Sequence, residues 1–159
     1  MTINVDFLAT QISAWAWELG FQGVGITDTH LPEAEIHLQQ WLTNNHHGAM
    51  SYMAHHGSKR SRPQELLPGT LRVISVRMNY WPQESVQEAV QQLENPEHGF
   101  ISRYALGRDY HKLVRKRLQA LADRISETVK EHHYRVYCDS APVLEKALAE
   151  KSGLGWIGK

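Results

Sequence analysis

Apolar residues near the start of the chain recur at helical spacing. Val5, Leu8, Ile12, Trp15 and Leu19 are three or four residues apart, which places them along one side of an α-helix. Glycine follows directly at position 20, and glycine is common just past a helix end because it adopts positive φ without strain. The pattern therefore predicts a helix over residues 5–19.

Three short segments have the pattern of β-strands. Residues 21–27 end at the turn-prone Asp28, and residues 71–80 carry apolar side chains on both faces, as strands buried on both sides do. Residues 134–138 alternate between apolar and polar side chains, which also favours a strand.

Further helices are expected between and after these strands. One runs from Pro32, which suits a first helical position, to about Leu42. A long helix capped by Asp109 runs to about Glu131, and another runs from Pro142 to Lys151. Residues 49–69 look irregular, and residues 82–99 look polar and loop-like with one helical turn. The sequence therefore predicts an α/β or α+β fold, with a sheet flanked by helices.

Composition narrows the class of protein. The 159 residues favour one domain, and 42% apolar with 21% charged residues exclude disorder as the main state. No stretch reaches the ~18 apolar residues of a membrane span, and the start lacks the features of a secretory signal. We therefore expect a cytoplasmic protein. Its single cysteine, Cys138, excludes a disulfide, a thiolate zinc site or a cysteine-ligated cluster within this chain.

One local stretch departs from the neutral charge of the whole chain. Lys plus Arg and Asp plus Glu each number 17, so a protein whose whole surface binds polyanions is excluded. Residues 101–117 nevertheless carry six basic residues against Asp109 alone, a charge of +5, with Tyr104 and Tyr110 interleaved. Such a stretch suits nucleic-acid phosphates, but it is also typical of a solvated helix face. The basic residues are Arg103, Arg108, Lys112, Arg115, Lys116 and Arg117.

Three other motifs have both a chemical and a structural interpretation. Gly153-x-Gly155-x-x-Gly158-Lys159 matches GxGxxG and the start of a Walker A loop, yet a helix end and turn gives the same glycines. Residues 46–47 and 55–56 are histidine pairs. They can be read as metal ligands or as part of a polar loop. Asp139, at the end of a predicted strand and before a predicted helix, is a candidate general acid or a helix cap.

Longer blocks of sequence carry a family resemblance that covers essentially the whole chain in order. The most specific are SRYALGRDYHK at 102–112, DSAP at 139–142 and LAEKSGLGWIGK at 148–159; GITDT at 25–29, RSRP at 60–63 and ELLPGTLRVISVRMNY at 65–80 accompany them. Together they closely resemble epoxyqueuosine reductases. The resemblance implies a nitroreductase- and reductive-dehalogenase-like sandwich, and reduction of epoxyqueuosine in tRNA to queuosine, the last step of queuosine synthesis.

The same resemblance implies cofactors, partners and residue roles. Cobalamin carries out the reduction, and two [4Fe–4S] clusters deliver its electrons from a donor protein or reductant. Asp139 matches the proton donor, Arg60 a cobalamin-contacting arginine, and Ser102 a position near the corrin where some members carry cysteine. The tRNA candidates are Arg103, Arg108, Arg115, Lys116 and Arg117.

The resemblance also indicates what these residues do not contain. The family's cysteine runs and C-terminal helical repeats follow the glycine-rich loop, and neither occurs within residues 1–159. We therefore expect residues 1–159 to be a truncated, monomeric N-terminal cobalamin-binding domain that is inactive by itself. Two alternatives stay open: a tRNA-binding module without redox activity, and a nucleotide-binding P-loop fragment.

Overall fold

A small antiparallel sheet organises the fold. The structure, a computed structural model, describes residues 4–81 and 86–158. Strand β1 (Gly23–Thr27) pairs with β2 (Val73–Arg77), with Gly23 opposite Arg77 and Thr27 opposite Val73. Within the described residues the sheet has these two strands. The protein is therefore a mixed α and β structure, as the sequence predicts.

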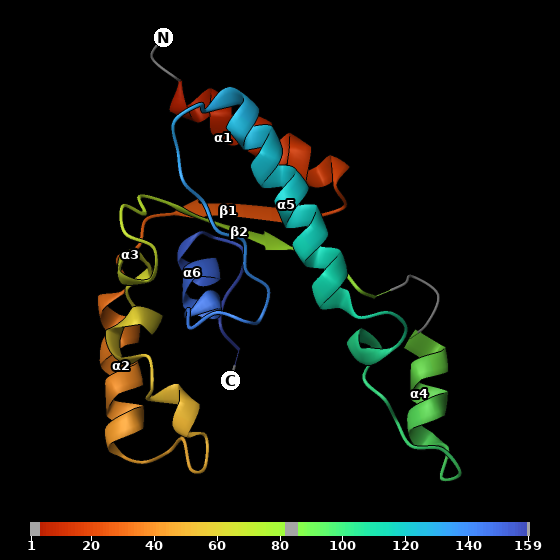
Figure 1. The fold of residues 1–159 in the computed structure, drawn as a ribbon. Coiled ribbons are helices and arrows are strands. Elements are labelled where there is room, and N and C mark those ends of the chain that lie inside the picture. Colours follow the sequence, from red (N-terminus) through yellow and green to blue (C-terminus); the bar gives the residue numbers. More distant parts are fainter. Residues whose placement is uncertain (1–3, 82–85, 159) are drawn as a thin grey trace.

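Helices cover both faces of the sheet. Helices α1 (Val5–Glu18) and α5 (Tyr110–Thr128) run side by side over one face, and the short α6 (Glu145–Lys151) lies against the other (Figure 1). Helix α2 (Pro32–Thr43) and α3 (Pro63–Leu66) lie to one side with the 3₁₀ turns η1 (Ser51–Met53) and η2 (Gly57–Arg60).

The core lies between α1, α5 and the sheet. Ile12 and Ala16 of α1 meet Leu121 of α5 and Phe21, whose side chain is 1% exposed. Partly buried apolar side chains surround this cluster, and those from the strands are Val24, Ile74 and Val76. Because side chains alternate across a strand, Gly23 and Gly25 face the opposite layer, where α6 approaches closely.

Helix α1 and the start of α5 follow their sequence predictions, but α5 ends at Thr128 instead of about Glu131. Asp109 caps α5 by accepting a hydrogen bond from the backbone N–H of His111 at 3.0 Å. Helix α1 ends at Gly20, whose φ is +84°, and the N–H of Phe21 turns back to the carbonyl of Ala16 at 2.9 Å. Together with the bond from the Gly20 N–H to the Trp17 carbonyl, this turn provides hydrogen bonds to carbonyls that the last helical turn leaves free.

The sequence predictions are wrong in three other segments. Residues 134–138 form no strand: they are extended but pair with neither strand, and a β-strand exists only with a partner. The last helix begins at Glu145 instead of Pro142, because the N–H of Leu144 bonds to the carbonyl of Arg60 at 2.9 Å, outside the helix. Within the polar region 82–99, helix α4 (Val86–Glu94) replaces the expected loop, and residues 82–85 lie outside the described residues.

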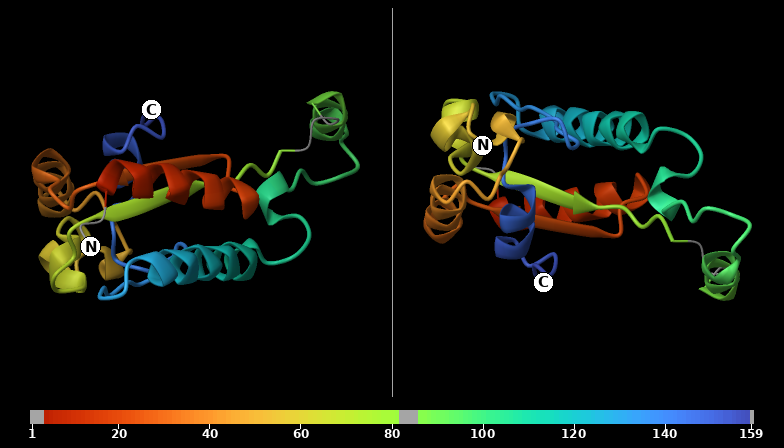
Figure 2. Two further views of the ribbon diagram at one scale, coloured as in Figure 1. Left: turned by 90° about the horizontal axis from the view of Figure 1, so that it is seen from above. Right: turned by 90° about the horizontal axis from the view of Figure 1, so that it is seen from below.

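The accessible surface of the molecule is much larger than that of a typical monomer of the same mass. Its accessible area is 11,913 Å², whereas a monomer of 18.2 kDa exposes about 8,100 Å² by the usual scaling. Helix α4 stands away from the sheet at the end of an arm (Figure 2), and Val86 and Leu93 on it are exposed. Among the described residues no helix is long and apolar enough to cross a bilayer.

Candidate functional site

Asp139 has a positive φ in the turn between α5 and α6. Its φ is +56°, in the left-handed region that glycine enters freely and that aspartate enters more often than most other residues. It follows residues 132–137, which have no regular secondary structure, and precedes α6. The contacts of its carboxyl group mark a candidate site.

Two neighbouring residues of α5 meet the Asp139 carboxylate. The Tyr110 hydroxyl donates a hydrogen bond to Asp139 Oδ2, and His111 Nε2 lies 3.3 Å from the same oxygen. This bond to the carboxylate raises the pKa of Tyr110 to about 12. The Tyr110 and His111 rings stack with centroids 4.1 Å apart, so each ring restricts the orientation of the other.

The far side of the His111 ring meets a second carboxylate. His111 Nδ1 lies 2.8 Å from Asp109 Oδ1, the oxygen that also caps the helix. The hydrogen bond from His111 holds the pKa of Asp109 below its usual value of 3.8. The imidazole of His111 therefore bridges two carboxylates, those of Asp109 and Asp139.

Other contacts hold the backbone of the Asp139 turn. Arg115 Nη2 donates to Ser140 Oγ at 2.9 Å, and the Glu145 carboxylate accepts from the backbone N–H of Asp139. Desolvation raises the pKa of Glu145, and the charge of Asp139 raises it further. Desolvation also raises the pKa of the Cys138 thiol, which favours the protonated, unreactive form.

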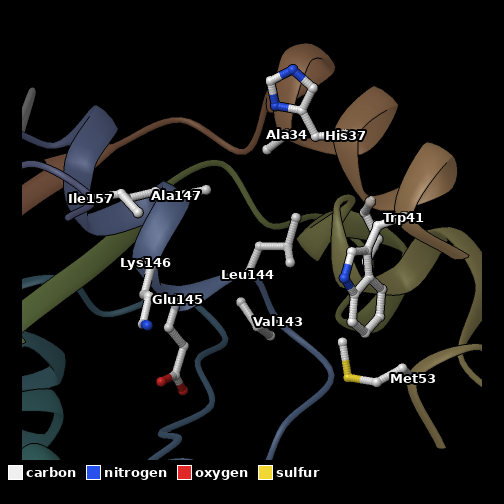
Figure 3. A pocket seen from close by; sticks show the side chains of 11 residues that line it. Ala34, His37, Trp41, Met53, Val143, Leu144, Glu145, Lys146, Ala147 and Ile157 are labelled. Carbon is white, nitrogen blue, oxygen red and sulfur yellow. The ribbon is translucent and has the colours of Figure 1, made fainter. Parts of the chain in front are cut away.

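Two hollows are each lined in part by a residue that contacts Asp139, although Asp139 itself lines neither. The smaller, of about 320 Å³, is lined by Tyr110 and Tyr104 together with Tyr80, Met78 and core residues. The larger, of about 570 Å³, opens between α2 and the start of α6. Figure 3 shows Trp41 and Met53 on one wall and Val143 and Leu144 on the other. Both volumes are in the range of small-molecule sites.

Arg60 joins two walls of the larger hollow. Its guanidinium donates to the carbonyls of Met53 at 3.1 Å and Tyr52 at 2.9 Å, and its own carbonyl accepts from the Leu144 N–H. Ser102 is exposed and directly precedes the 3₁₀ turn η3 (Arg103–Ala105).

The predicted tRNA residues divide into two groups. Arg115 bonds to Ser140, Arg103 lies over the Trp81 ring at 4.9 Å, and Arg117 reaches inward to Met78 Sδ at 3.2 Å. These three side chains make contacts within the fold, although Arg115 is still exposed to solvent. Arg108 and Lys116 are exposed as well.

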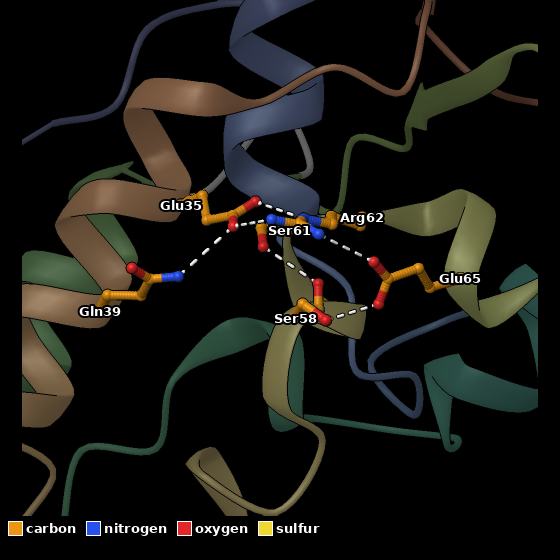
Figure 4. A network of polar contacts seen from close by, with 6 residues as sticks. All are labelled: Glu35, Gln39, Ser58, Ser61, Arg62 and Glu65. Carbon is orange, nitrogen blue, oxygen red and sulfur yellow. Dashed lines mark hydrogen bonds and ion pairs between the residues drawn. The ribbon is translucent and has the colours of Figure 1, made fainter.

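A polar cluster that the sequence analysis did not single out joins α2 to α3. Arg62 forms two bonds to Glu35, at 2.7 and 3.0 Å, and one to Glu65 at 3.1 Å (Figure 4). Ser58 donates to Glu65 at 2.5 Å. Arg62 lowers the pKa of Glu35, and Ser58 and then Arg62 lower that of Glu65. The bidentate contact between Arg62 and Glu35, which ties α2 to the start of α3, indicates a structural role.

The glycine-rich end is a helix terminus. Gly153 has φ +79°, its N–H bonds to the Glu150 carbonyl at 2.9 Å, and the Leu154 N–H bonds to Ala149 at 3.0 Å. A phosphate loop needs a strand before its glycines, and here α6 precedes them, so the P-loop interpretation is wrong. The described residues hold no group of three or more His, Cys, Asp or Glu arranged for a metal, at the histidine pairs or elsewhere.

The described geometry defines a class of protein: a mixed α and β protein whose helices hold the carboxyl group of a positive-φ turn, beside two hollows lined by residues that contact it. A family model described as "Epoxyqueuosine reductase QueG, DUF1730" matches residues 60–140. The chain belongs to the epoxyqueuosine reductase family.

Relatives and solved structures agree with this membership. The chain is 62% identical over 152 residues to the Pseudomonas aeruginosa epoxyqueuosine reductase, covering 96% of this chain and 42% of the relative. It is 55% identical over 157 residues to that of Escherichia coli, covering 99% and 41%. It therefore spans about two fifths of the length of these curated relatives.

The likeness to solved structures concerns the fold. A structure of epoxyqueuosine reductase from Streptococcus thermophilus matches with a TM-score of 0.75 at 24% identity, over 94% of this chain and 40% of that one. An epoxyqueuosine reductase solved with an epoxyqueuosine-modified tRNA stem loop matches with a TM-score of 0.71 at 23% identity, over 96% and 40%.

Proposed function

We propose that residues 1–159 are the N-terminal, cobalamin-binding part of an enzyme that reduces epoxyqueuosine in tRNA to queuosine. The observation that carries the proposal is the Asp139 turn. A carboxyl group is held at positive φ by Tyr110, His111 and Glu145, at the position where the family resemblance implies the proton donor. The nitroreductase-like arrangement of the whole sandwich belongs to the same proposal.

The chemistry of the reaction explains why such an acid is needed. Reduction of an epoxide to an alkene consumes two electrons and two protons and releases the oxygen as water. Both C–O bonds break, and each departing oxygen charge has to be neutralised. Asp139 supplies the proton to the epoxide oxygen when its carboxyl is protonated, and it is left as a carboxylate.

The larger hollow is the candidate site for one edge of cobalamin. Its apolar walls, including Trp41, Met53 and Leu144, suit the methyl-rich rim of a corrin ring, and Arg60 fixes those walls from behind. When bound, cobalamin supplies low-potential electrons to the epoxide. Arg60 thus serves the cofactor by shaping the hollow.

Iron–sulfur clusters do not fit the donor set of these residues. A [4Fe–4S] cluster needs about four cysteine ligands, and this chain has one cysteine, whose thiol pKa is raised by desolvation. The two clusters that the family resemblance implies therefore require thiolates from other residues of a full-length protein.

The tRNA partner is proposed for the exposed basic residues at the start of α5. Arg108 and Lys116 are free to approach phosphates, since their side chains lie on the surface. The structural neighbour solved with an epoxyqueuosine-modified tRNA stem loop supports a tRNA partner, and the surface exposure of these two side chains is the reason for choosing them.

The test uses a chimera in which residues 1–159 replace the matching region of the Pseudomonas aeruginosa enzyme. Asp139→Asn removes the acid but retains the size and most hydrogen bonds, so single-turnover reduction slows by roughly 10²-fold or more. Asp6→Asn, the same change at an exposed position of α1, is the matched control and leaves the rate unchanged. An Asp139→Asn chimera that binds cobalamin and reacts at the parent rate would refute the acid role.

A tRNA-binding module without redox activity is the second candidate, because the chain has one cysteine. The two candidates differ in corrinoid binding. If the 159-residue chain binds a tRNA stem loop and no cobalamin, and the chimera also fails to bind cobalamin, the module interpretation holds.

A further inference from the structure

The Asp109–His111–Asp139 contacts do more than hold the turn. We infer that His111 relays a proton from solvent to Asp139 between the two protonation steps of the reaction. This inference rests on the proposed function, since it concerns the acid of that reaction. It begins with the hydrogen-bond roles of the two imidazole nitrogens.

Asp109 fixes which nitrogen of His111 carries a proton. Its carboxylate, with a lowered pKa, is an acceptor only. It lies 2.8 Å from Nδ1, so Nδ1 must donate. The same oxygen accepts the His111 backbone N–H at 3.0 Å, which anchors the carboxylate to the first turn of α5. In a neutral imidazole the other nitrogen, Nε2, is then an acceptor.

The acceptor Nε2 of His111 faces a carboxylate oxygen of Asp139, which is also an acceptor unless a proton lies between the two atoms. His111 Nε2 is 3.3 Å from Asp139 Oδ2. An imidazole lone pair and a carboxylate lone pair repel, so the contact is favourable in two states only. In one, a carboxylic acid donates to neutral imidazole; in the other, imidazolium donates to carboxylate. Tyr110 donates to Oδ2 in both states. In both favourable states the two groups share one proton between Nε2 and Oδ2.

The stoichiometry gives this proton a use. The reaction consumes two protons, and a single carboxyl group delivers one before it needs another. Once Asp139 has delivered the shared proton, both groups are unprotonated at the contact. The His111 side chain is 44% exposed, so Nε2 takes up a second proton from water and passes it to Oδ2. This restores the carboxylic acid and leaves neutral imidazole, so charge and atoms balance.

The ring is also held in the orientation that the transfer needs. Tyr110 stacks on His111 with a 26° interplanar angle, and Tyr104 meets Tyr110 edge-on with centroids 6.0 Å apart. His111 acts through Asp139 instead of on the substrate, so it is a positioning residue that also carries a proton. The titratable and charged groups around the contact are Asp109, Tyr110, Lys112 and Arg115 from the α5 side, and Cys138 and Glu145 from the turn and α6.

The first test reads the tautomer directly on the 159-residue chain. Two-bond ¹H–¹⁵N NMR distinguishes Nδ1–H from Nε2–H, and His111→Gln assigns the signals by their loss. We expect the Nδ1–H tautomer in the neutral ring, and Asp139→Asn shifts the His111 signals while those of the other histidines stay in place. A neutral ring with Nε2–H, or His111 signals that ignore Asp139→Asn, would overturn the inference.

The second test uses turnover in the chimera. His111→Gly slows reduction by roughly 10-fold or more, toward the scale of general acid–base catalysis, and added imidazole restores much of the rate. A merely structural role would not respond to imidazole. Tyr110→Phe retains the stacked ring and is the control for loss of one donor to Asp139.

The two arms separate failure of this inference from failure of the proposed function. If Asp139→Asn abolishes turnover of the chimera and His111→Gly does not change it, the proposed function is supported and the proton relay through His111 is overturned. A chimera with no turnover at all counts against the function, while the NMR arm still decides the His111–Asp139 contact.

Discussion

Gly25 determines how closely α6 approaches the sheet, so Gly25→Ala is a sharp test of the fold beneath the site. A Cβ at this position would lie 2.1 Å from Ser152 Oγ, 2.6 Å from Ser152 Cβ and 2.8 Å from the Ser152 carbonyl oxygen. Rotation of the serine side chain relieves the first contact only. To restore an ordinary separation of 3.4 Å from Ser152 Cβ, the tighter of the two remaining contacts, the end of α6 has to move by about 0.8 Å.

The cost follows from what that movement disturbs. Leu148 of α6 is 1% exposed, so displacement of the helix loosens a fully buried side chain. Overpacking of this kind costs typically about 1–3 kcal/mol, and we expect about 2 kcal/mol for Gly25→Ala. For a protein of this length that corresponds to a Tm lower by about 4–8 °C.

Gly23→Ala is the matched control on the same strand and the same face. Its added Cβ meets Leu154 Cδ2 at 3.0 Å and Arg77 Nε at 3.5 Å, both on flexible side chains that can move. We expect a change within about 0.5 kcal/mol, as for a tolerated substitution. Adding Ser152→Gly to Gly25→Ala removes two of the three close contacts and recovers part of the loss.

The assay is urea unfolding of the 159-residue chain, followed by far-UV circular dichroism and by tryptophan fluorescence. A changed midpoint with an unchanged slope gives the difference in stability directly. Equal effects of Gly25→Ala and Gly23→Ala, or no recovery with Ser152→Gly, would refute the argument that α6 is seated on Gly25.

Two further predictions concern charge. Desolvation raises the pKa of Glu145 above its usual 4.5. Above that pH the folded state therefore binds more protons than the unfolded state, and stability falls as pH rises. We expect Glu145→Gln to stabilise the chain at neutral pH but not below about pH 4, as measured by urea titrations at both pH values. In the chimera, alanine at Arg108 and Lys116 weakens tRNA stem-loop binding and reduces the salt slope by about 1–2, whereas alanine at exposed Lys130, just past α5, changes neither.

Local signals in the sequence were sufficient for α1 and α5. Each has a long apolar stripe and an end residue, Gly20 or Asp109, whose effect depends only on its neighbours. Helix α4 was missed although Val86, Val90 and Leu93 have helical spacing, because its polar composition resembled a loop. Residues 134–138 failed for another reason: a strand depends on a partner that a local pattern does not reveal.

The candidate site was predictable in part for similar reasons. The family motif located Asp139, but its two partners, Tyr110 and His111, lie about 29 residues away along the chain. The basic stretch was visible as a charge of +5, yet the sequence did not reveal that Arg117 turns inward beneath Gly20. Both facts depend on how α5 lies across α1 and the Asp139 turn.

Arg60 makes the larger hollow and the Asp139 turn mechanically one unit. Its guanidinium holds the backbone of Met53 on one wall, and its carbonyl holds Leu144, just before Glu145, whose carboxylate binds the Asp139 N–H. A ligand that spreads the hollow therefore also displaces the peptide that precedes Glu145 and, through it, the Asp139 turn. If Asp139 is the acid that we propose, linkage requires the converse: protonation of Asp139 changes how tightly the hollow holds its ligand.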